Sequence, residues 1–542
     1  MVLLLMLATT VVWGQEEQEG GIENVEIEIV KVKQITMPKA NRNFEKIPPR
    51  PAEPLAPAMT YDFRTINFAA PDYTPTVKPL RLKDETLSKI YGNYVSLGYG
   101  NYNSPFARVS LASKRNEEKY YGLDFLHHSF GNGPVDKDYS GSGYSKLNGY
   151  YSAMGAKLTS DVGLAYENMF NHFYGYPGPK KPESADDVRQ SYNIIGLNAS
   201  VSNTKAGDFN FKLGGEFSYL RDRFNATESE GGLHFNSRYQ VNKTQAFKLA
   251  SDYFLIDRKD SKVTAKARHL FKVNPAYEFV IAERFRLSAG LNAVVENDSI
   301  GKDKAVHIYP DVWIHTGIAK SIDAYAGITG DYEKVDLHTL ARENQWINSN
   351  ISVFHTNKSF EFRAGVQGKV FRKASFHVGT SVINFKHLYF FENSVSDRSR
   401  FNVVYDDAVR LDFFGEVGVV HADKVNINLR GDYYSYSMHK LDYPWQRPTN
   451  KVGFYSSYKM FDKVLLTANL ISQGGAKAKD NETGKVVTLK SALNLEGKVR
   501  YFISKPVSVY IEVNNALNSK YPIYQYYQAR GIMVSAGLSW SF

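Results

Sequence analysis

The sequence predicts an all-β fold, a transmembrane antiparallel β-barrel of about 22 strands (20–22) that follows a proline-rich N-terminal extension. Three observations support this prediction. The closing segment, residues 532–542, alternates apolar and polar side chains without a break. From about residue 89 onward, short polar turns alternate with longer polar connections. The 542-residue chain also has no internal run of about 18 apolar residues, so it offers no transmembrane helix.

The closing segment shows the two faces of a strand at their clearest. One face carries Ile532, Val534, Ala536, Leu538, Trp540 and Phe542, and the other carries Met533, Ser535, Gly537, Ser539 and Ser541. Successive side chains of a strand point to opposite sides, so one face is apolar and the other small and polar. We expect the apolar face to meet lipid and the polar face to line the lumen.

Three further segments repeat this alternation. In the first, Phe209, Phe211, Leu213, Phe217 and Tyr219 oppose Asn210, Lys212, Glu216 and Ser218. In the second, Val425, Ile427, Leu429 and Tyr433 oppose Asn426, Asn428, Arg430 and Asp432. In the third, Val507, Val509, Ile511 and Val513 oppose Ser508, Tyr510, Glu512 and Asn514. Because charged side chains are costly on a lipid-facing surface, the polar faces are predicted to be luminal.

The turns predict the strand number. Short turns fall at 116–119, 158–161, 204–209, 242–245, near Glu283, and at 319–323, 371–375, 421–425, 460–464 and 503–507. Longer connections fall at 131–143, 174–188, 333–358, 440–449 and 473–486. Short turns are typical of the periplasmic side of such barrels and long loops of the extracellular side. With both termini in the periplasm, ten short turns require 22 strands.

The chain divides into three parts by composition. Residues 1–14 are an apolar run that predicts a signal peptide. Residues 15–86 hold nine of the 20 prolines, which favours an extended periplasmic or luminal segment. Residues 87–542 form the predicted outer-membrane β-barrel, and the 37 tyrosines suit its interfacial aromatic girdles. The absence of cysteine excludes disulfides and a lipoprotein anchor.

The formal net charge of +10 has two interpretations. One is contact with anionic lipid headgroups or acidic partners, and the other is a solvated surface with a modest excess of lysine. No nucleic-acid-binding module is present, so no nucleic-acid partner is expected.

The end of the chain resembles a TonB-dependent receptor. The stretch Val513-Asn514-Asn515-Ala516-Leu517-Asn518-Ser519-Lys520-Tyr521 is similar to the family's Asn-Leu-Phe-Asp-Lys-Lys-Tyr-like stretch before the final strand. The resemblance implies a 22-strand barrel in the outer membrane of a Gram-negative bacterium. Residues 15–86 contain no recognisable plug domain and no Ile-Arg-Gly-like motif. In this respect, and in Gly92-Asn93-Tyr94 and Gly100-Asn101-Tyr102, the chain looks like plugless receptor-like barrels of Bacteroidota.

The resemblance also implies partners: outer-membrane lipid and lipopolysaccharide, the barrel-assembly machinery, and TonB or other envelope proteins. Leu538, Trp540 and Phe542 resemble the C-terminal signal that the assembly machinery recognises. Val25, Ile27 and Ile29 lie in a segment that resembles a TonB box, which pairs with its energiser by strand addition. An exposed, soluble edge strand is the alternative for that segment.

Candidate metal and catalytic residues are few. Asp136, Asp138 and Ser140, with Gly141, match the first half of a calcium loop, but position twelve is Leu147 rather than glutamate. A polar outer loop is the alternative. His127 and His128 would face opposite sides of a strand and do not form a metal pair unaided. No hydrolase, P-loop or metalloprotease motif is present, so we expect neither enzymatic activity nor a cofactor.

Two tyrosine clusters have two interpretations each. Tyr433, Tyr434 and Tyr436, and Tyr524, Tyr526 and Tyr527, either stack against a ligand or belong to the interfacial girdles. For the whole chain, two functions are considered. The first is a receptor-like barrel for solute uptake across the outer membrane, and the second is a non-transporting scaffold or accessory subunit of an assembly or secretion complex.

Overall fold

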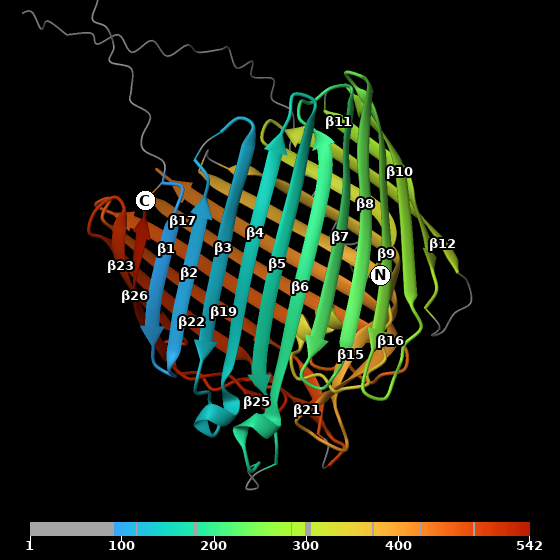
Figure 1. The fold of residues 1–542 in the computed structure, drawn as a ribbon. Helices are drawn as coiled ribbons and strands as arrows, with labels where there is room; N and C mark the ends of the chain where they lie inside the picture. Colours follow the sequence, from blue (N-terminus) through green and yellow to red (C-terminus); the bar gives the residue numbers. More distant parts are fainter. Residues whose placement is uncertain are drawn as a thin grey trace, which may run out of the picture. The chain divides into compact units, whose positions relative to one another are not determined.

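Residues 91–542 form a closed antiparallel β-barrel of 22 strands in the computed structural model (Figure 1). The structure describes these residues except 115, 178–181, 283, 299–304, 371–372, 423 and 481–482. Each barrel strand pairs with its neighbours in chain order, and β1 pairs with β26 to close the barrel. The predicted fold class and strand number are therefore confirmed. The predicted signal peptide, the proline-rich extension and the TonB-box-like segment lie outside the described residues.

The barrel strands occupy most of the described chain. The first eight are β1 (Tyr94–Gly100), β2 (Ser104–Ala112), β3 (Lys119–Phe130), β4 (Ser142–Met154), β5 (Leu158–His172), β6 (Arg189–Asn203), β7 (Phe209–Asp222) and β8 (Thr227–Asn242). The next seven are β9 (Gln245–Lys259), β10 (Arg268–Ile281), β11 (Phe285–Glu296), β12 (Val306–Ala319), β13 (Ile322–Glu333), β14 (Thr356–Val370) and β15 (Ala374–Asn393). The last seven are β16 (Phe401–His421), β17 (Val425–Met438), β18 (Asn450–Met460), β19 (Val464–Gly474), β22 (Ala492–Phe502), β23 (Val507–Asn514) and β26 (Met533–Ser541).

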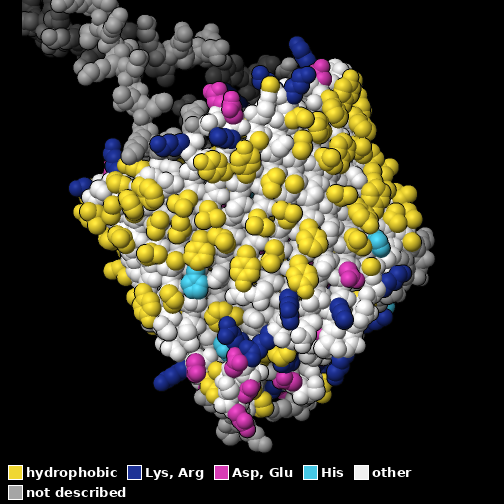
Figure 2. All heavy atoms as spheres, viewed as in Figure 1, with side chains coloured by type: hydrophobic (Ala, Val, Ile, Leu, Met, Phe, Trp, Pro, Cys, Tyr) yellow, Lys and Arg dark blue, Asp and Glu magenta, His cyan; other side chains and the backbone are white. Residues whose placement is uncertain are grey.

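The alternation of side chains places apolar groups outside and polar groups inside. Phe209, Leu213 and Phe217 of β7 are exposed on the outer surface. On β17, Leu429 is exposed outward, whereas Arg430 pairs with carboxylates inside. Figure 2 shows the resulting apolar band, with charged side chains gathered above and below it. Such a band suits a lipid-facing surface, because the strands pair their backbone groups with neighbouring strands.

The barrel closes where its first and last strands meet. Val95 is opposite Trp540 and Leu97 is opposite Leu538 in the register of β1 against β26. Beyond the strands, Asn93 and Phe542 exchange two backbone hydrogen bonds of 3.1 and 3.0 Å. The closure removes the free edges that an open sheet would expose to the membrane.

Ten short turns lie at one end of the barrel, which we call the short-turn end. They join β2 to β3, then each even-numbered strand to its successor as far as β19, and finally β22 to β23. Nine of the ten predicted short turns are found there at the predicted positions, together with Phe542. The prediction for 158–161 was wrong by one turn length, because these residues begin β5 and the turn itself lies at 155–157. Each turn carries one exposed cation that belongs to a set we call the basic turn ring: Lys114, Lys157, Lys205, Lys243, Arg284, Lys320, Lys373, Lys424, Lys463 and Lys505.

The opposite end, the long-loop end, carries the remaining secondary structure. The loops there contain the short helices η1 (Lys137–Ser140), η2 (Ala185–Val188) and α2 (Leu337–Glu343). They also contain two small hairpins, made by β20 (Lys477–Lys479) with β21 (Val486–Thr488) and by β24 (Pro522–Tyr524) with β25 (Tyr527–Gln528). In the part of the chain that the structure describes, no helix has the length and apolarity to cross a membrane.

Candidate functional site: the loop cap and the charged lumen

The loop between β13 and β14 is the main structural element at the long-loop end. Its helix α2 begins after Asp336, whose carboxylate accepts a hydrogen bond of 2.6 Å from the backbone N–H of Thr339. This side-chain cap satisfies one of the free N–H groups of the first turn. Leu337, Leu340 and Ala341 are buried, so the helix packs its apolar face against other residues rather than water.

Polar contacts attach α2 to strands β5 and β8, which precede it in the chain. The Glu228 carboxylate of β8 accepts hydrogen bonds from the backbone N–H groups of Leu337 and His338, at 2.9 and 3.2 Å. Arg342 donates to both carboxylate oxygens of Glu167 on β5, at 2.8 and 2.6 Å. These contacts hold the loop against the inner surfaces of β5 and β8.

An aromatic cluster joins this loop to two others. The rings of Trp346 and Tyr527 are stacked with centroids 4.1 Å apart, and Tyr174 meets Tyr527 edge-on at 4.7 Å. Phe401, at the start of β16, also contacts Tyr527 at 5.8 Å. Tyr527 is fully buried. Because β5, β16 and β26 lie far apart around the barrel, these loops meet across its mouth, and we call residues 173–176, 334–355 and 522–529 the loop cap.

The loop cap corrects one sequence-based interpretation. Tyr524 and Tyr527 belong neither to an interfacial girdle nor to an open stacking platform, because both are packed inside the cap. Tyr433 does face outward, as a girdle residue would. Tyr434 and Tyr436 face the lumen beside the Arg410 guanidinium, at 5.6 and 5.9 Å. Aromatic residues serve girdles and cores equally well, and composition does not separate the two.

Buried ionisable groups lie where the cap meets the barrel wall. His355 is buried, and its Nδ1 accepts a hydrogen bond of 3.0 Å from the backbone N–H of Val335. Burial, together with the nearby Arg268, lowers the pKa of His355 to about 3. Burial alone would raise the pKa of Asp336, but its ion pair with Lys334, at 3.1 Å, holds that pKa below its ordinary value. The cap therefore contains a neutral histidine among charged neighbours.

A cavity of about 200 Å³ opens beside this region. Arg258, Lys266 and Arg268 contribute cationic groups to its lining, and Val353 and Phe354 contribute apolar surface. Arg268 is neutralised by Asp298 at 2.7 Å, whereas the buried Nη1 of Arg258 has no hydrogen-bond partner among the described residues. Such a cavity can hold a small group that carries a hydrogen-bond acceptor or a negative charge.

The lumen below the cap is lined with paired charges. Arg430 binds both Glu416 and Asp432, at 3.0 and 2.7 Å, and Lys498 binds Glu512 at 2.6 Å. Alternation along β16, β17, β22 and β23 brings these side chains to the inner face. Pairing keeps the wall strongly polar while limiting its net charge. The predicted luminal positions of Arg430, Asp432 and Glu512 are thus confirmed.

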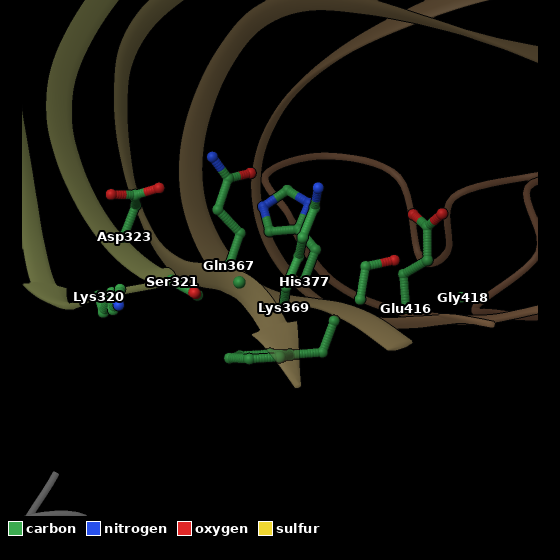
Figure 3. A pocket seen from close by; sticks show the side chains of 11 residues that line it. Lys320, Ser321, Asp323, Gln367, Lys369, His377, Glu416 and Gly418 are labelled. Carbon is green, nitrogen blue, oxygen red and sulfur yellow. The ribbon is translucent and has the colours of Figure 1, made fainter. Parts of the chain in front are cut away.

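A second cavity, of about 550 Å³, lies on the inner wall near the short-turn end. Figure 3 shows Asp323, Gln367, His377 and Glu416 projecting from adjacent strands on the same side of the sheet. His377 Nε2 is 2.9 Å from the Tyr325 hydroxyl. The lining of this cavity is polar, so the polar inner wall of the lumen extends toward the short-turn end.

The calcium-loop residues do not converge. Asp136 accepts a hydrogen bond of 2.5 Å from Tyr176, and the buried Ser140 hydroxyl is bonded within its own loop to Val135. Asp138 lies within η1. Among the described residues, no group of three or more acidic or histidine side chains is placed to hold a metal ion. Calcium binding at this loop remains an untested prediction.

The residues of the C-terminal signal lie together on the outer surface. Leu538 and Trp540 are exposed on β26, and the rings of Trp540 and Phe542 are stacked at 4.3 Å. Their role in assembly remains a prediction. His127 and His128 do point to different surroundings, since His127 contacts Ser145 at 2.8 Å and the His128 ring packs on Phe130.

Sequence reasoning did not identify the cap residues Trp346 and His355, nor Glu228 of β8, which binds the cap helix. A local signal existed for α2, because Asp336 three positions before Thr339 is a typical N-cap arrangement. No local signal indicates that Glu228 receives this helix, because the two segments are far apart in the sequence.

No family model matches the sequence, and no curated protein is similar to it. Solved structures do share the fold. The siderophore receptor PirA from Acinetobacter baumannii superposes with a TM-score of 0.65 at 11% identity, over 84% of this chain and 81% of that chain. The FrpB iron transporter from Neisseria meningitidis gives a TM-score of 0.65 at 9% identity, over 84% and 82%.

The ferric-catecholate import receptor Fiu from Escherichia coli K12 gives a TM-score of 0.62 at 7% identity, over 84% of this chain and 82% of that chain. At such low identity the likeness defines the fold alone. The chain is thus a closed 22-strand barrel with the fold of these siderophore and iron receptors.

Proposed function

We propose that the protein takes up a bulky solute across the outer membrane, with the loop cap as its binding and gating element. The observation that carries this proposal is the cap itself: loops from separate parts of the barrel pack across the mouth of a charged lumen. A scaffold needs neither a packed mouth nor a polar inner wall. A transport barrel uses both, since the mouth selects and the wall conducts.

The short-turn end is proposed to face the periplasm, with both chain termini there. Short turns and the closing strand at that end support this orientation. A solute would then meet the cap first, pass the paired charges of the lumen, and leave beside Asp323 and His377. The cavity beneath Arg258 supports contact with an acceptor-bearing or anionic part of the solute.

The solute class to test first is the ferric siderophores. This choice is supported by the structural neighbours, which include a siderophore receptor and an iron transporter. The proposed experiment deletes the gene and measures uptake of iron-loaded catecholate, hydroxamate and carboxylate chelators. We expect the deletion to abolish uptake of one class of chelator, and complementation with the gene to restore that uptake. Unchanged uptake of all three classes, with stable co-purification of other envelope proteins, would favour the scaffold function.

The cap can be tested independently of the solute. Replacing residues 337–353 by a glycine-serine linker of equal length should raise single-channel conductance in a planar bilayer, because the linker lacks the apolar and charged anchors. The matched control replaces residues 483–485 of the small hairpin loop, which lie outside the cap and leave the contact between Asp480 and Tyr526 in place. Equal conductance of the two variants would contradict a gating role for the cap.

Energy coupling is a separate part of this proposal. Residues 25–32 carry the TonB-box-like alternation with Val25, Ile27 and Ile29. Proline at residue 27 would block strand addition, because it removes a backbone donor. We expect Ile27→Pro to abolish uptake while conductance stays unchanged, with Ile27→Val as the control. Normal uptake in Ile27→Pro would argue against coupling through this segment.

A further inference from the structure

We propose that the basic turn ring binds the anionic headgroups of the lipid leaflet around the short-turn end. Every one of the ten short turns contributes a cation to this ring, and every one of these ten side chains is exposed. None of the ten forms an ion pair with the described part of the chain. The ten cations form a closed circle at one end of the barrel, where they outnumber the exposed carboxylates of the described short turns, Glu117, Glu118, Asp208 and Asp462.

The contrast with the lumen shows that this circle is unusual within the molecule. Arg410, Arg430 and Lys498 each contact a carboxylate within 3.0 Å on the inner wall. The ring cations lack such internal partners, so they raise the positive potential along the rim. Mobile or membrane-bound anions are the natural counter-charges for the positive charge that remains in excess at this rim.

Apolar side chains beside the cations indicate that the counter-charges belong to lipids. Lys463 is two residues from Phe461, which is 82% exposed, and Lys505 is two residues from Ile503, which is 58% exposed. Leu158 follows Lys157 directly and is also exposed. A cation paired with an exposed apolar neighbour fits the membrane interface, where the apolar group enters the acyl layer and the cation meets phosphate. A soluble acidic partner would leave these apolar groups in water.

One turn has a groove that suits a complete lipid. Between β2 and β3, a hollow of about 680 Å³ is lined by Leu111, Tyr121 and Leu123 and ends at Lys114 and Lys119. The three apolar residues are exposed on the outer surface. An acyl chain along the two leucines would bring a headgroup phosphate to the lysines. The ligand class is therefore an anionic phospholipid, and its binding is independent of whether the barrel takes up a solute.

Trp540 provides a local reporter of the leaflet at this rim. It is 48% exposed on the outer surface, opposite Val507, and Ser541 donates a hydrogen bond to Pro506 of the Lys505 turn. The other described tryptophans, Trp313, Trp346 and Trp445, are hydrogen-bonded inside or buried. Brominated lipids quench only tryptophans that they touch, and Trp540→Phe in each background supplies the blank.

The experiment reconstitutes the full-length protein in bilayers with brominated phosphatidylglycerol or brominated phosphatidylcholine. The ring variant changes Lys157, Lys205, Lys243, Lys463 and Lys505 to glutamine. The control variant changes five exposed lysines of the long-loop end to glutamine, namely Lys262, Lys440, Lys485, Lys490 and Lys520. Both variants lower the net charge by the same amount. Heat-modifiable migration in gels verifies that each variant has formed its barrel.

We expect the wild-type protein and the control variant to show about fivefold preferential quenching by phosphatidylglycerol, the effect of one cation at a charged interface. The ratio of quenching by phosphatidylglycerol to quenching by phosphatidylcholine should fall to about one in the ring variant. In the wild type, this ratio should decrease at high salt. Equal quenching by the two lipids in the wild type would overturn the proposal. So would an unchanged preference in the ring variant, or loss of an acidic protein partner from that variant without any change in quenching.

Discussion

At the scale of single residues, Tyr527 joins the three parts of the loop cap. It contacts Trp346, Tyr174 and Phe401 and is fully buried. Tyr527→Ala should destabilise the cap by about 3–5 kcal/mol, the usual cost of truncating a buried aromatic residue. Hydrogen exchange of residues 335–353 should accelerate, while thermal unfolding of the barrel stays unchanged, because the cap is a local unit. Ile523→Ala, at an exposed site of the same hairpin, is the control. Unaltered exchange in Tyr527→Ala would contradict this role.

His355 makes the cap sensitive to acid. The folded protein keeps this histidine neutral, with a pKa of about 3 against the ordinary value of 6.5. When the cap opens, His355 regains its ordinary pKa and binds a proton. The free energy needed to open the cap therefore decreases as the pH falls below about 6.5. The loss is about 2 kcal/mol at pH 5, at 1.36 kcal/mol per pH unit.

Lys334, Arg268, Asp298 and Asp336 surround His355. Asp298 and Asp336 also have lowered pKa values, so their contributions disappear at still lower pH. Hydrogen exchange of residues 335–353, corrected for intrinsic rates, should rise between pH 7 and pH 5. His355→Gln keeps an acceptor for the Val335 N–H without titrating, so the difference in pH dependence between the wild type and this variant measures the contribution of His355. The carboxylates Glu228 and Glu230, which also contact the cap, are common to both proteins. A dependence that survives in that variant would assign it to other groups.

At the scale of elements, helix α2 depends on its N-cap and on its two carboxylate anchors. Asp336→Ala removes the bond to Thr339 and the ion pair with Lys334. We expect the helix to lose about 1–2 kcal/mol, since caps of this type have that value. Exchange at residues 339–343 should increase about tenfold. Asp336→Asn retains a side-chain acceptor and should show a smaller effect, and an equal effect in both variants would point to the ion pair rather than the cap.

At the scale of the whole molecule, the terminal residue takes part in closing the barrel. Phe542 is hydrogen-bonded to Asn93 and stacks on Trp540 at the outer surface. If it also ends the assembly signal, Phe542→Ala should lower outer-membrane levels several-fold. Phe209→Ala, at another exposed phenylalanine of the outer surface, is the matched control. The measurement is the amount of heat-modifiable protein in isolated outer membranes. Wild-type amounts in Phe542→Ala would contradict the signal.

The strand pattern shows how far local sequence reasoning reaches. Alternation at residues 209–219, 425–433 and 507–514 was sufficient to assign lipid and luminal faces, and the ten turns gave the strand number. Each of these inferences depends on residues that are neighbours in sequence, because the period of a strand and the chemistry of a tight turn are local properties.

The sequence by itself determined the all-β class, the 22 strands, the two faces of the wall and the placement of long loops at one end. Only the tertiary structure decided that Glu228 receives helix α2 and that Tyr527 meets Trp346 across the mouth. The physical reason is that the faces of a strand follow from its own period, whereas loop packing depends on surfaces brought together by barrel closure. An aromatic residue has the same local pattern in a girdle as in a cap, and only its neighbours in space distinguish the two.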